Sequence, residues 1–263
     1  MSGADAPLAG RKVVVTRAAD QVGDFTDALK EAGAEVIELP TIETVPPDSW
    51  EEFDRAALGL AGFDYALFTS ANALRFFLAR LKELGLDATG LKGVKIIAVG
   101  PKTAAALVSA GFPPDVIPAE FVAEGVVEAL SGVDMKGKRV LFPRAKEARE
   151  VLVEALREMG AEVVLAVVYQ TVCPKADPGR IREIFRGGGV SAITFTSSST
   201  VRNFMKMAGE GAAGLLGGVS VACIGPVTAK TCEEMGILVS VVPRDYTVDA
   251  LFDALTEKFG RRS

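Results

Sequence analysis

The stretch Ala28–Val36 reads ALKEAGAEV, and 127 positions later Ala155–Val163 reads ALREMGAEV. The segment before it repeats as well, because VVVTR at Val13–Arg17 returns as VLFPR at Val140–Arg144. Further on, a Thr-Ser pair recurs at residues 69–70 and 196–197, and a Gly-Pro pair at residues 100–101 and 225–226. A period this long is not that of a stacked repeat unit. It indicates a duplicated domain, and therefore two domains of modest size.

Within each copy, short apolar runs alternate with stretches of helical spacing. The first copy has an apolar run at Lys12–Thr16, a helical pattern that stops at Gly33, and a second apolar run at Glu35–Leu39. Matching signals stand at residues 139–142, 151–159 and 162–169. Further strands are expected at residues 66–68, 95–99, 192–195 and 220–224 and just before Pro118 and Pro243, with helices at 73–84, 126–130, 201–208 and 251–255. This alternation predicts two doubly wound parallel-sheet domains, flavodoxin-like α/β layers covered on both faces.

The composition is that of an ordinary globular protein. The 263 residues are 49% hydrophobic and 24% charged, which allows a full core, and we expect disorder only in the first few residues and the Arg-Arg-Ser tail. No apolar run approaches the length of a membrane span, and the first seven residues lack the pattern of a secretory signal. A net charge of −5 with no basic stripe argues against nucleic acid. We expect a cytoplasmic monomer that binds neither membrane nor nucleic acid.

The chain contains no histidine, and this restricts its chemistry. Histidine is the commonest general base and the commonest metal ligand, so triad hydrolysis and histidine-bound zinc are both excluded. The three cysteines, Cys173, Cys223 and Cys232, suggest neither a disulfide framework nor a metal cluster. Any reaction must use carboxylates, lysine, tyrosine, hydroxyls, thiols or backbone amides, and we expect no metal.

The residues just after the strands are the candidate ligand contacts, because ligands of open parallel sheets sit beyond the carboxyl ends of the strands. These loops are rich in hydroxyls and small residues, and each begins a helix whose first N–H groups favour an anion. Helix capping alone explains any single loop, since serine, threonine and asparagine are standard caps. Six such loops together favour a large polyanion. The candidates are Ser70, Asn72, Gly100, Lys102, Thr103, Ser197, Ser198, Ser199, Gly225 and Thr228.

Two arginines and a tyrosine complete the candidate set. Arg17 and Arg144 follow equivalent strands, and arginine can bind a carboxylate through two parallel hydrogen bonds. A salt bridge at the sheet edge is the alternative for each. Tyr169 ends an apolar strand just before a proline-bearing connector. It either packs its ring there or serves as a weak acid, a role that the absence of histidine makes more attractive.

Two glycine-rich segments do not match known nucleotide-binding patterns. Residues 132–139 resemble a phosphate-binding loop, but Arg139 replaces the required serine or threonine and the segment precedes a strand. Gly187–Gly189 has no dinucleotide fingerprint around it. A dinucleotide cofactor is therefore disfavoured, although a flavodoxin-like fold alone would have suggested FMN.

Taken in order, these motifs resemble the uroporphyrinogen-III synthase family. The resemblance rests on the strand ending Thr-Arg, FTSANA at residues 68–73, AVGPKT at 98–103, the second strand ending Pro-Arg, VVYQT at 167–171, TFTSSST at 194–200 and CIGPVT at 223–228, and it spans Gly10 to Leu255. It implies a cofactor-free enzyme of tetrapyrrole biosynthesis. Its substrate would be hydroxymethylbilane, a linear tetrapyrrole polycarboxylate, which is cyclised with loss of water and inversion of ring D.

The resemblance also implies a crossed domain arrangement. The repeat alone would divide the chain near Gly132, whereas the family implies one domain made of residues 1–39 and 173–263 and another made of residues 42–170. Segments near 38–47 and 168–174 would form a two-stranded hinge. The family's tyrosine maps onto Tyr169 as proton donor, and its hydroxyl-bearing loops map onto Ser70, Ser197 and Thr228. Asn72 stands where many members have arginine.

Two other functions share this architecture. A non-enzymatic, hinged anion-binding module would need no Tyr169, and it would not speed formation of the type III isomer over spontaneous closure to type I. A flavin-binding electron carrier would be yellow when purified.

Overall fold

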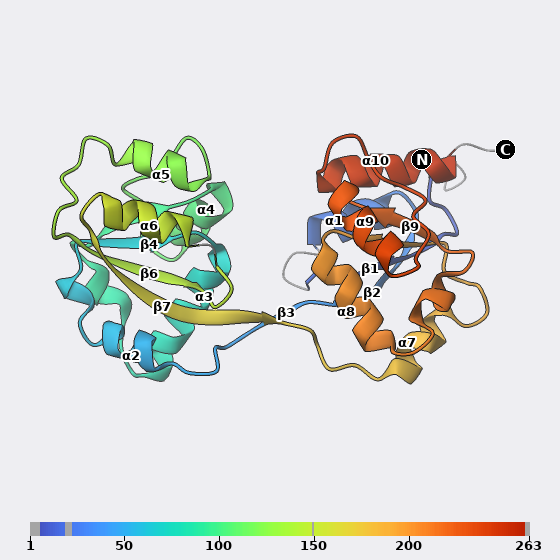
Figure 1. Ribbon diagram of the computed structural model, residues 1–263, viewed down its shortest axis with the longest axis horizontal. Coiled ribbons are helices and arrows are strands. Elements are labelled where there is room, and N and C mark those ends of the chain that lie inside the picture. The colour runs from blue at the N-terminus through green and yellow to red at the C-terminus, as the bar shows by residue number, and fades with distance from the viewer. Residues whose placement is uncertain (1–5, 19–22, 149, 261–263) are drawn as a thin grey trace. The chain divides into compact units, whose positions relative to one another are not determined.

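The computed structural model describes residues 6–18, 23–148 and 150–260. The expected disorder at the two ends of the chain and most of the segment tested for a secretory signal therefore lie outside the described residues. The chain divides into two compact units. Unit 1 consists of Met1–Glu43 and Val172–Ser263, and unit 2 consists of Thr44–Thr171. Figure 1 shows the helices and strands of both units.

Unit 1 is built on a four-stranded sheet in the order β2-β1-β8-β9. Its strands are β1 (Lys12–Val15), β2 (Glu35–Glu38), β8 (Ala192–Phe195) and β9 (Ser220–Cys223), and the neighbours pair in parallel. The apolar residues of β1 alternate between the two faces of the sheet, since Val13 and Val15 belong to one core cluster and Val14 to the other. Helices α1 (Gly23–Glu31) and α10 (Val248–Gly260) cover the first face, and α7 (Pro178–Phe185), α8 (Ser198–Ala208) and α9 (Pro226–Glu234) cover the second.

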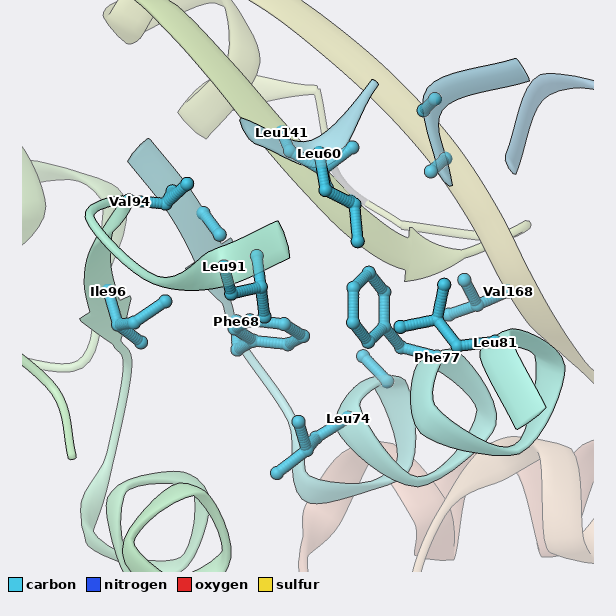
Figure 2. Close-up of a cluster of buried hydrophobic side chains, with 14 of the residues drawn as sticks. Leu60, Phe68, Leu74, Phe77, Leu81, Leu91, Val94, Ile96, Leu141 and Val168 are labelled. Atoms are coloured by element: carbon cyan, nitrogen blue, oxygen red, sulfur yellow. The ribbon is translucent and has the colours of Figure 1, made fainter. Parts of the chain in front are cut away.

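Unit 2 has a five-stranded sheet in the order β3-β7-β6-β4-β5. The strands are β3 (Glu43–Val45), β4 (Tyr65–Phe68), β5 (Lys95–Ala98), β6 (Arg139–Ala145) and β7 (Glu162–Val172). Helices α2 (Glu51–Ala57), α3 (Ala71–Glu83) and α4 (Pro101–Ser109) cover one face, and α5 (Ala123–Ala129) and α6 (Val151–Glu158) cover the other. Figure 2 shows the first of these two cores, in which Phe68 of β4 meets Phe77 of α3 edge-on at 5.5 Å between ring centroids.

The two sheets place equivalent strands in the same order but draw them from both copies of the repeat. By the 127-residue repeat, β6, β7 and β4 correspond to β1, β2 and β8, so β7-β6-β4-β5 matches β2-β1-β8-β9. Each sheet therefore combines the first strands of one copy with the later strands of the other. This is the doubly wound arrangement, and the predicted fold class is confirmed. The chain passes between the units at residues 43–44 and 171–172, next to the neighbouring strands β3 and β7.

Some predicted elements differ from the observed ones. The expected final strand of each copy is reduced to one isolated parallel bridge, Ile97 with Val116 and Ala222 with Val241. A proline follows two residues after each of these valines, and proline cannot donate a hydrogen bond to a sheet. Helix α2 was not predicted, and α7 was expected only as a helix of unstated bounds before the Gly187–Gly189 loop. The start of α7 carries a clear signal, because the Asp177 side chain caps it and Pro178 is its first residue.

The three cysteines are free, and the fold brings two of them close together. The buried Cys223 and Cys232 thiols lie 3.5 Å apart, a proximity the sequence did not indicate. The hydrogen bond with Cys232 and burial raise the pKa of the Cys223 thiol, so it stays protonated. Across the described ranges, no helix is both long and apolar enough to cross a membrane. No group of metal-ligating side chains was found among those same residues.

Candidate active site

Tyr169 lies near the end of β7, the longest strand of the described chain. The register of β7 against β6 shifts here, because Arg144 pairs with Val167 whereas Ala145 pairs with Tyr169. A bulge of this kind changes the direction in which the following side chain points, and bulges often occur beside active sites. The Tyr169 ring stacks on Phe76 of α3 at 5.6 Å and 12°, and its hydroxyl lies 3.3 Å from Ser70 Oγ. The tyrosine is thus held by its ring and by its hydroxyl.

Ser70 connects this tyrosine to the start of α3. Its Oγ accepts a hydrogen bond from the Ala73 amide at 3.0 Å and so caps the helix, as the capping interpretation predicted. The same oxygen is within hydrogen-bonding distance of the Tyr169 hydroxyl. Capping fixes the position of Ser70 on the backbone, and Ser70 in turn orients Tyr169. For this loop, capping and a role at the site are compatible.

A cation that the sequence reasoning missed stands beside them. Arg75 donates to Asn72 Oδ1 from Nε at 3.4 Å and from Nη2 at 3.3 Å, and it donates to Thr44 Oγ1 at 3.2 Å. Its guanidinium lies 4.4 Å from the centroid of the Phe76 ring, which also stacks on Tyr169. The available signal was helical spacing, because residues three apart on a helix share a face. Arg75, one turn after Asn72, thus places a guanidinium beside the Asn72 side chain.

The second loop of unit 2 begins α4 with Gly100 and Pro101. Gly100 has φ of 92°, a conformation that favours glycine, and Pro101 occupies the first helical position. Lys102 is exposed at the start of the helix, whereas Thr103 is only 3% exposed. Of this loop's candidates, Lys102 presents its side chain to solvent, and Thr103 is largely enclosed.

A cavity of about 510 Å³ opens at the same edge of unit 2. Thr69 and Val99 line it directly after β4 and β5, Phe142 lines it from the middle of β6, and Phe121 and Val122 line it from the segment before α5. It therefore lies where β6 meets β4, the point at which the strand order reverses, and the crevice at such a point is the usual ligand position in this architecture. The lining is mainly apolar.

The corresponding loops of unit 1 form a compact hydroxyl cluster. Ser197 and Thr200 form a capping box at the start of α8, and Ser197 Oγ lies 2.8 Å from Ser199 Oγ. Ser198 Oγ lies 2.7 Å from Thr231 Oγ1 of α9. Ser198 Oγ also lies 3.4 Å from the Val227 carbonyl oxygen in the first turn of α9, so the start of α8 is bonded to α9 at two places. Near them, Gly225 precedes Pro226 of α9 and Thr228 is 4% exposed, so that loop offers backbone more than side chain.

The two predicted arginines differ in their surroundings. Arg17 of unit 1 is half-buried, and its Nε atom is buried without a hydrogen-bond partner among the described residues. Burial lowers the pKa of its guanidinium. Arg144 of unit 2 is 3% exposed, pairs with Glu150 at 2.8 Å and donates to the Ala148 carbonyl. Arg144 Nη1 makes this ion pair without a hydrogen bond, and the arginine is held to the loop after β6, whereas Arg17 Nε has neither kind of partner in the part of the chain that the structure describes.

Within unit 2, the fold brings Tyr169 next to Ser70, 99 positions earlier in the sequence, at the start of the helix that also carries Asn72. Within unit 1, it brings together Ser197, Ser198 and Ser199 with the start of α9. A hydroxyl that can donate a proton and several helix N-termini are suited to acid catalysis on a polyanionic substrate.

Comparison with known proteins gives one family. The protein-family model described as uroporphyrinogen-III synthase HemD matches residues 23–253 of this chain. A curated uroporphyrinogen-III synthase of Synechococcus elongatus is 38% identical over 99% of both chains. A uroporphyrinogen-III synthase of Chlorobaculum parvum is 29% identical over 94% of this chain and 98% of the relative.

Solved structures show the same fold. The uroporphyrinogen-III synthetase of Helicobacter pylori superimposes with a TM-score of 0.63 at 20% identity, covering 94% of this chain and 99% of that one. A mutant uroporphyrinogen III synthase of Thermus thermophilus gives a TM-score of 0.55 at 21% identity, covering 96% and 100%.

Proposed function

The chain belongs to the uroporphyrinogen-III synthase family of enzymes, and we propose how its residues perform that family's reaction. The reaction cyclises hydroxymethylbilane with inversion of ring D and loss of water, a step of tetrapyrrole biosynthesis. This membership disfavours a non-enzymatic anion-binding module, because the matched relatives are named as synthases.

Tyr169 is the proton donor of the proposed mechanism. Departure of the ring A hydroxyl as water needs one proton and leaves an electrophilic azafulvene. The substituted carbon of ring D attacks this centre, and the resulting spiro intermediate breaks and recloses in the inverted orientation. Reclosure releases the proton of the unsubstituted α-carbon of ring D, and this proton restores the Tyr169 hydroxyl. The contact between Tyr169 and Ser70, on a strand bulge at the carboxyl edge of the sheet, is the observation that supports the tyrosine as the acid.

The substrate's carboxylates are bound at the two carboxyl edges. In unit 1, Arg17 and the starts of α8 and α9 supply donors, through Ser197, Ser198, Ser199, Gly225 and Thr228. In unit 2, Ser70, Asn72, Gly100, Lys102 and Thr103 do so, together with Arg75. Backbone amides and helix dipoles act locally, which is how a protein of net charge −5 accommodates a polyanion. Arg144 contributes by fixing the loop that follows β6.

Positioning is the second task of the site. Holding the two ends of a flexible chain together converts an improbable encounter into an intramolecular step, worth up to roughly 7–11 kcal/mol in favourable cases. We propose that units 1 and 2 act as separate domains and that the segments around β3 and β7 form the hinge between them. The protein would act as a cytoplasmic monomer without a metal or organic cofactor.

The test is to add the purified protein to hydroxymethylbilane under anaerobic conditions and separate the isomers. We expect the type III isomer to form faster than spontaneous closure gives type I, and a chelator to leave the rate unchanged. Product that is all type I, formed at the spontaneous rate, would reject the function.

A further inference from the structure

Two aromatic side chains are exposed at equivalent positions of the duplication. Phe121 in unit 2 is 55% exposed and Tyr246 in unit 1 is 63% exposed. Each stands five residues after the valine that forms the last parallel bridge of its sheet, Val116 or Val241. A residue that follows a parallel strand lies at the carboxyl edge, so each unit carries one exposed ring at the edge that holds the proposed site.

Each ring lies against the glycine that begins a rim helix. A Cβ atom added to Gly225 would come within 3.2 Å of the Tyr246 ring, closer than ordinary contact. The backbone of Gly225 is extended, with φ of −172°, so its conformation does not require glycine, and a larger residue there would have to displace the Tyr246 ring. In unit 2, a Cβ atom on Gly100 would lie 4.0 Å from the Phe121 ring. Both rings thus rest beside bare backbone at equivalent positions.

Phe121 also forms part of the cavity where β6 meets β4. Two further exposed apolar side chains, Val122 and Val151, are 51% and 53% exposed and line the same cavity. Large apolar groups gathered at a concave site are typical of the binding of a flat, apolar ligand part. The helix N-termini and arginines can bind the carboxylates of a ligand. The exposed apolar side chains of this cavity match a different, apolar part of it.

We propose that Phe121 and Tyr246 are stacking surfaces for pyrrole rings of the substrate, one at the rim of each unit. This inference rests on the proposed function, which makes the ligand a chain of pyrroles. Pyrroles are flat and aromatic, and offset stacking on a phenyl or phenol ring gains attraction beyond area burial alone. The carboxylate contacts would hold the substituents of the chain, and the two rings would orient the planes of the pyrroles.

The experiment measures KM, kcat and the isomer ratio for Phe121→Ala and Tyr246→Ala. Each should raise KM about fivefold, with kcat changed less than twofold, as expected for one lost stacking contact. Phe121→Tyr and Tyr246→Phe keep an aromatic ring and should restore the wild-type KM. Phe121→Leu and Tyr246→Leu keep apolar bulk without the ring and should restore it only in part.

Leu58 and Leu238 provide matched controls. They are 80% and 88% exposed. Leu58 lies between α2 and β4, and Leu238 lies between α9 and the bridge at Val241, so both lie toward the amino edges of their sheets. Leu58→Ala and Leu238→Ala should leave KM unchanged. Thermal unfolding of every variant separates a folding defect from a binding defect.

Several outcomes would overturn the stacking proposal. One is an unchanged KM in both alanine variants. Another is a KM that leucine restores as fully as an aromatic residue does. A third is a lower unfolding midpoint with no change in KM. In each of these cases the wild-type protein still produces the type III isomer, so the proposed function survives. If the wild-type protein produces none, the function itself fails.

Discussion

The two units share a sheet order, yet only one of them carries the candidate acid. The strand β2 of unit 1 ends at Glu38, shortly before Pro40, whereas its counterpart β7 continues to Val172 without meeting a proline. Proline cannot continue a hydrogen-bonded ladder, so the first copy stops short. Tyr169 lies on the extended part, and the matching residue of the first copy is Ile42, which carries no hydroxyl. Duplication supplied two scaffolds, and the longer strand of one of them carries the tyrosine.

The two equivalent arginines also differ, but here it is unit 1 that carries the side chain with a donor unpartnered within the described residues. Arg144 has Glu150 as its partner, and the residue of unit 1 that matches Glu150 is Gly23, which offers no carboxylate. Equivalent arginines are thus paired with a carboxylate in unit 2 and, at Nε, without a partner in the described part of the chain in unit 1. The difference between the units indicates that symmetry of fold does not carry over into symmetry of chemistry.

The largest expected effect tests the tyrosine. Tyr169→Phe removes the acidic hydroxyl but keeps the ring on Phe76, so turnover should fall about 100-fold with little change in stability. Tyr65→Phe makes the same chemical change at the first residue of β4, on the opposite edge of the sheet, and should leave turnover unchanged. Steady-state rates of type III formation check both variants. Near-normal turnover of Tyr169→Phe would refute the proton-donor role.

The second test separates the arginines. Arg144→Met should lower the free energy of unfolding by about 2 kcal/mol, because the hydrogen bond from the buried guanidinium to the Ala148 carbonyl and the ion pair with Glu150 are lost. Arg17→Met should raise KM about tenfold, the loss of one charge-assisted contact, and leave unfolding nearly unchanged. Urea titration and steady-state kinetics on both variants provide the measurement. If both variants changed KM and the free energy of unfolding to the same extent, the proposed difference between Arg17 and Arg144 would be rejected.

The third test concerns the two serine caps. Ser70→Ala and Ser197→Ala should each cost about 1 kcal/mol of stability, the usual value of a capping side chain. Ser70→Ala also removes the contact with the Tyr169 hydroxyl and should shift the pH profile of kcat. Ser70→Thr keeps a hydroxyl and should restore the profile. A pH profile identical in Ser70→Ala and wild type would mean that Ser70 only caps α3.

The smallest expected effect is a difference in acid sensitivity. Hydrogen bonds from the Lys138 side chain and the Arg139 amide, each 2.9 Å, lower the pKa of Asp64 in unit 2. Asp64 therefore stabilises the folded state above its unfolded pKa of about 3.9, and this contribution is lost as the pH falls below that value. The equivalent residue of unit 1 is Ser191, which does not titrate in this range.

Trp50, the single tryptophan, packs against the core of unit 2 and reports its unfolding. The urea midpoint read by its fluorescence should fall between about pH 5 and pH 3, and Asp64→Ser should reduce that fall. An equal fall in wild type and Asp64→Ser would assign the acid sensitivity to other carboxylates.

Much of the fold could be predicted from the sequence because strand and helix signals are local. The runs at Lys12–Thr16 and Arg139–Phe142, and the glycines that end helices, gave most elements to within a few residues. The final strands were overestimated because the prolines that limit them act through hydrogen bonds between strands. Helix α2 was overlooked because the segment around it was interpreted as a connector, and α7 was expected only as a helix of unstated bounds before Gly187.

The site was predictable only in outline. The carboxyl-edge rule selected the loops that the fold gathers at the two sheet edges. It could not distinguish Arg17 from Arg144, since the difference depends on Glu150 folding back onto one of them. The contact between Ser70 and Tyr169 joins residues 99 positions apart, and no local pattern encodes it. Arg75 was hidden for the same reason, because its place in the site depends on the ring stacked against Tyr169.

The exchange of strands between the copies has a consequence for how the chain matures during synthesis. Unit 2 is one uninterrupted stretch, Thr44–Thr171, and can complete its sheet as soon as that stretch leaves the ribosome. In unit 1, β1 can pair with β2 early, but its other neighbour, β8, begins only at Ala192. The sheet of unit 1 is therefore completed late, because closing so long a loop is slow. Nascent chains should therefore protect β6 from proteolysis well before they protect β1.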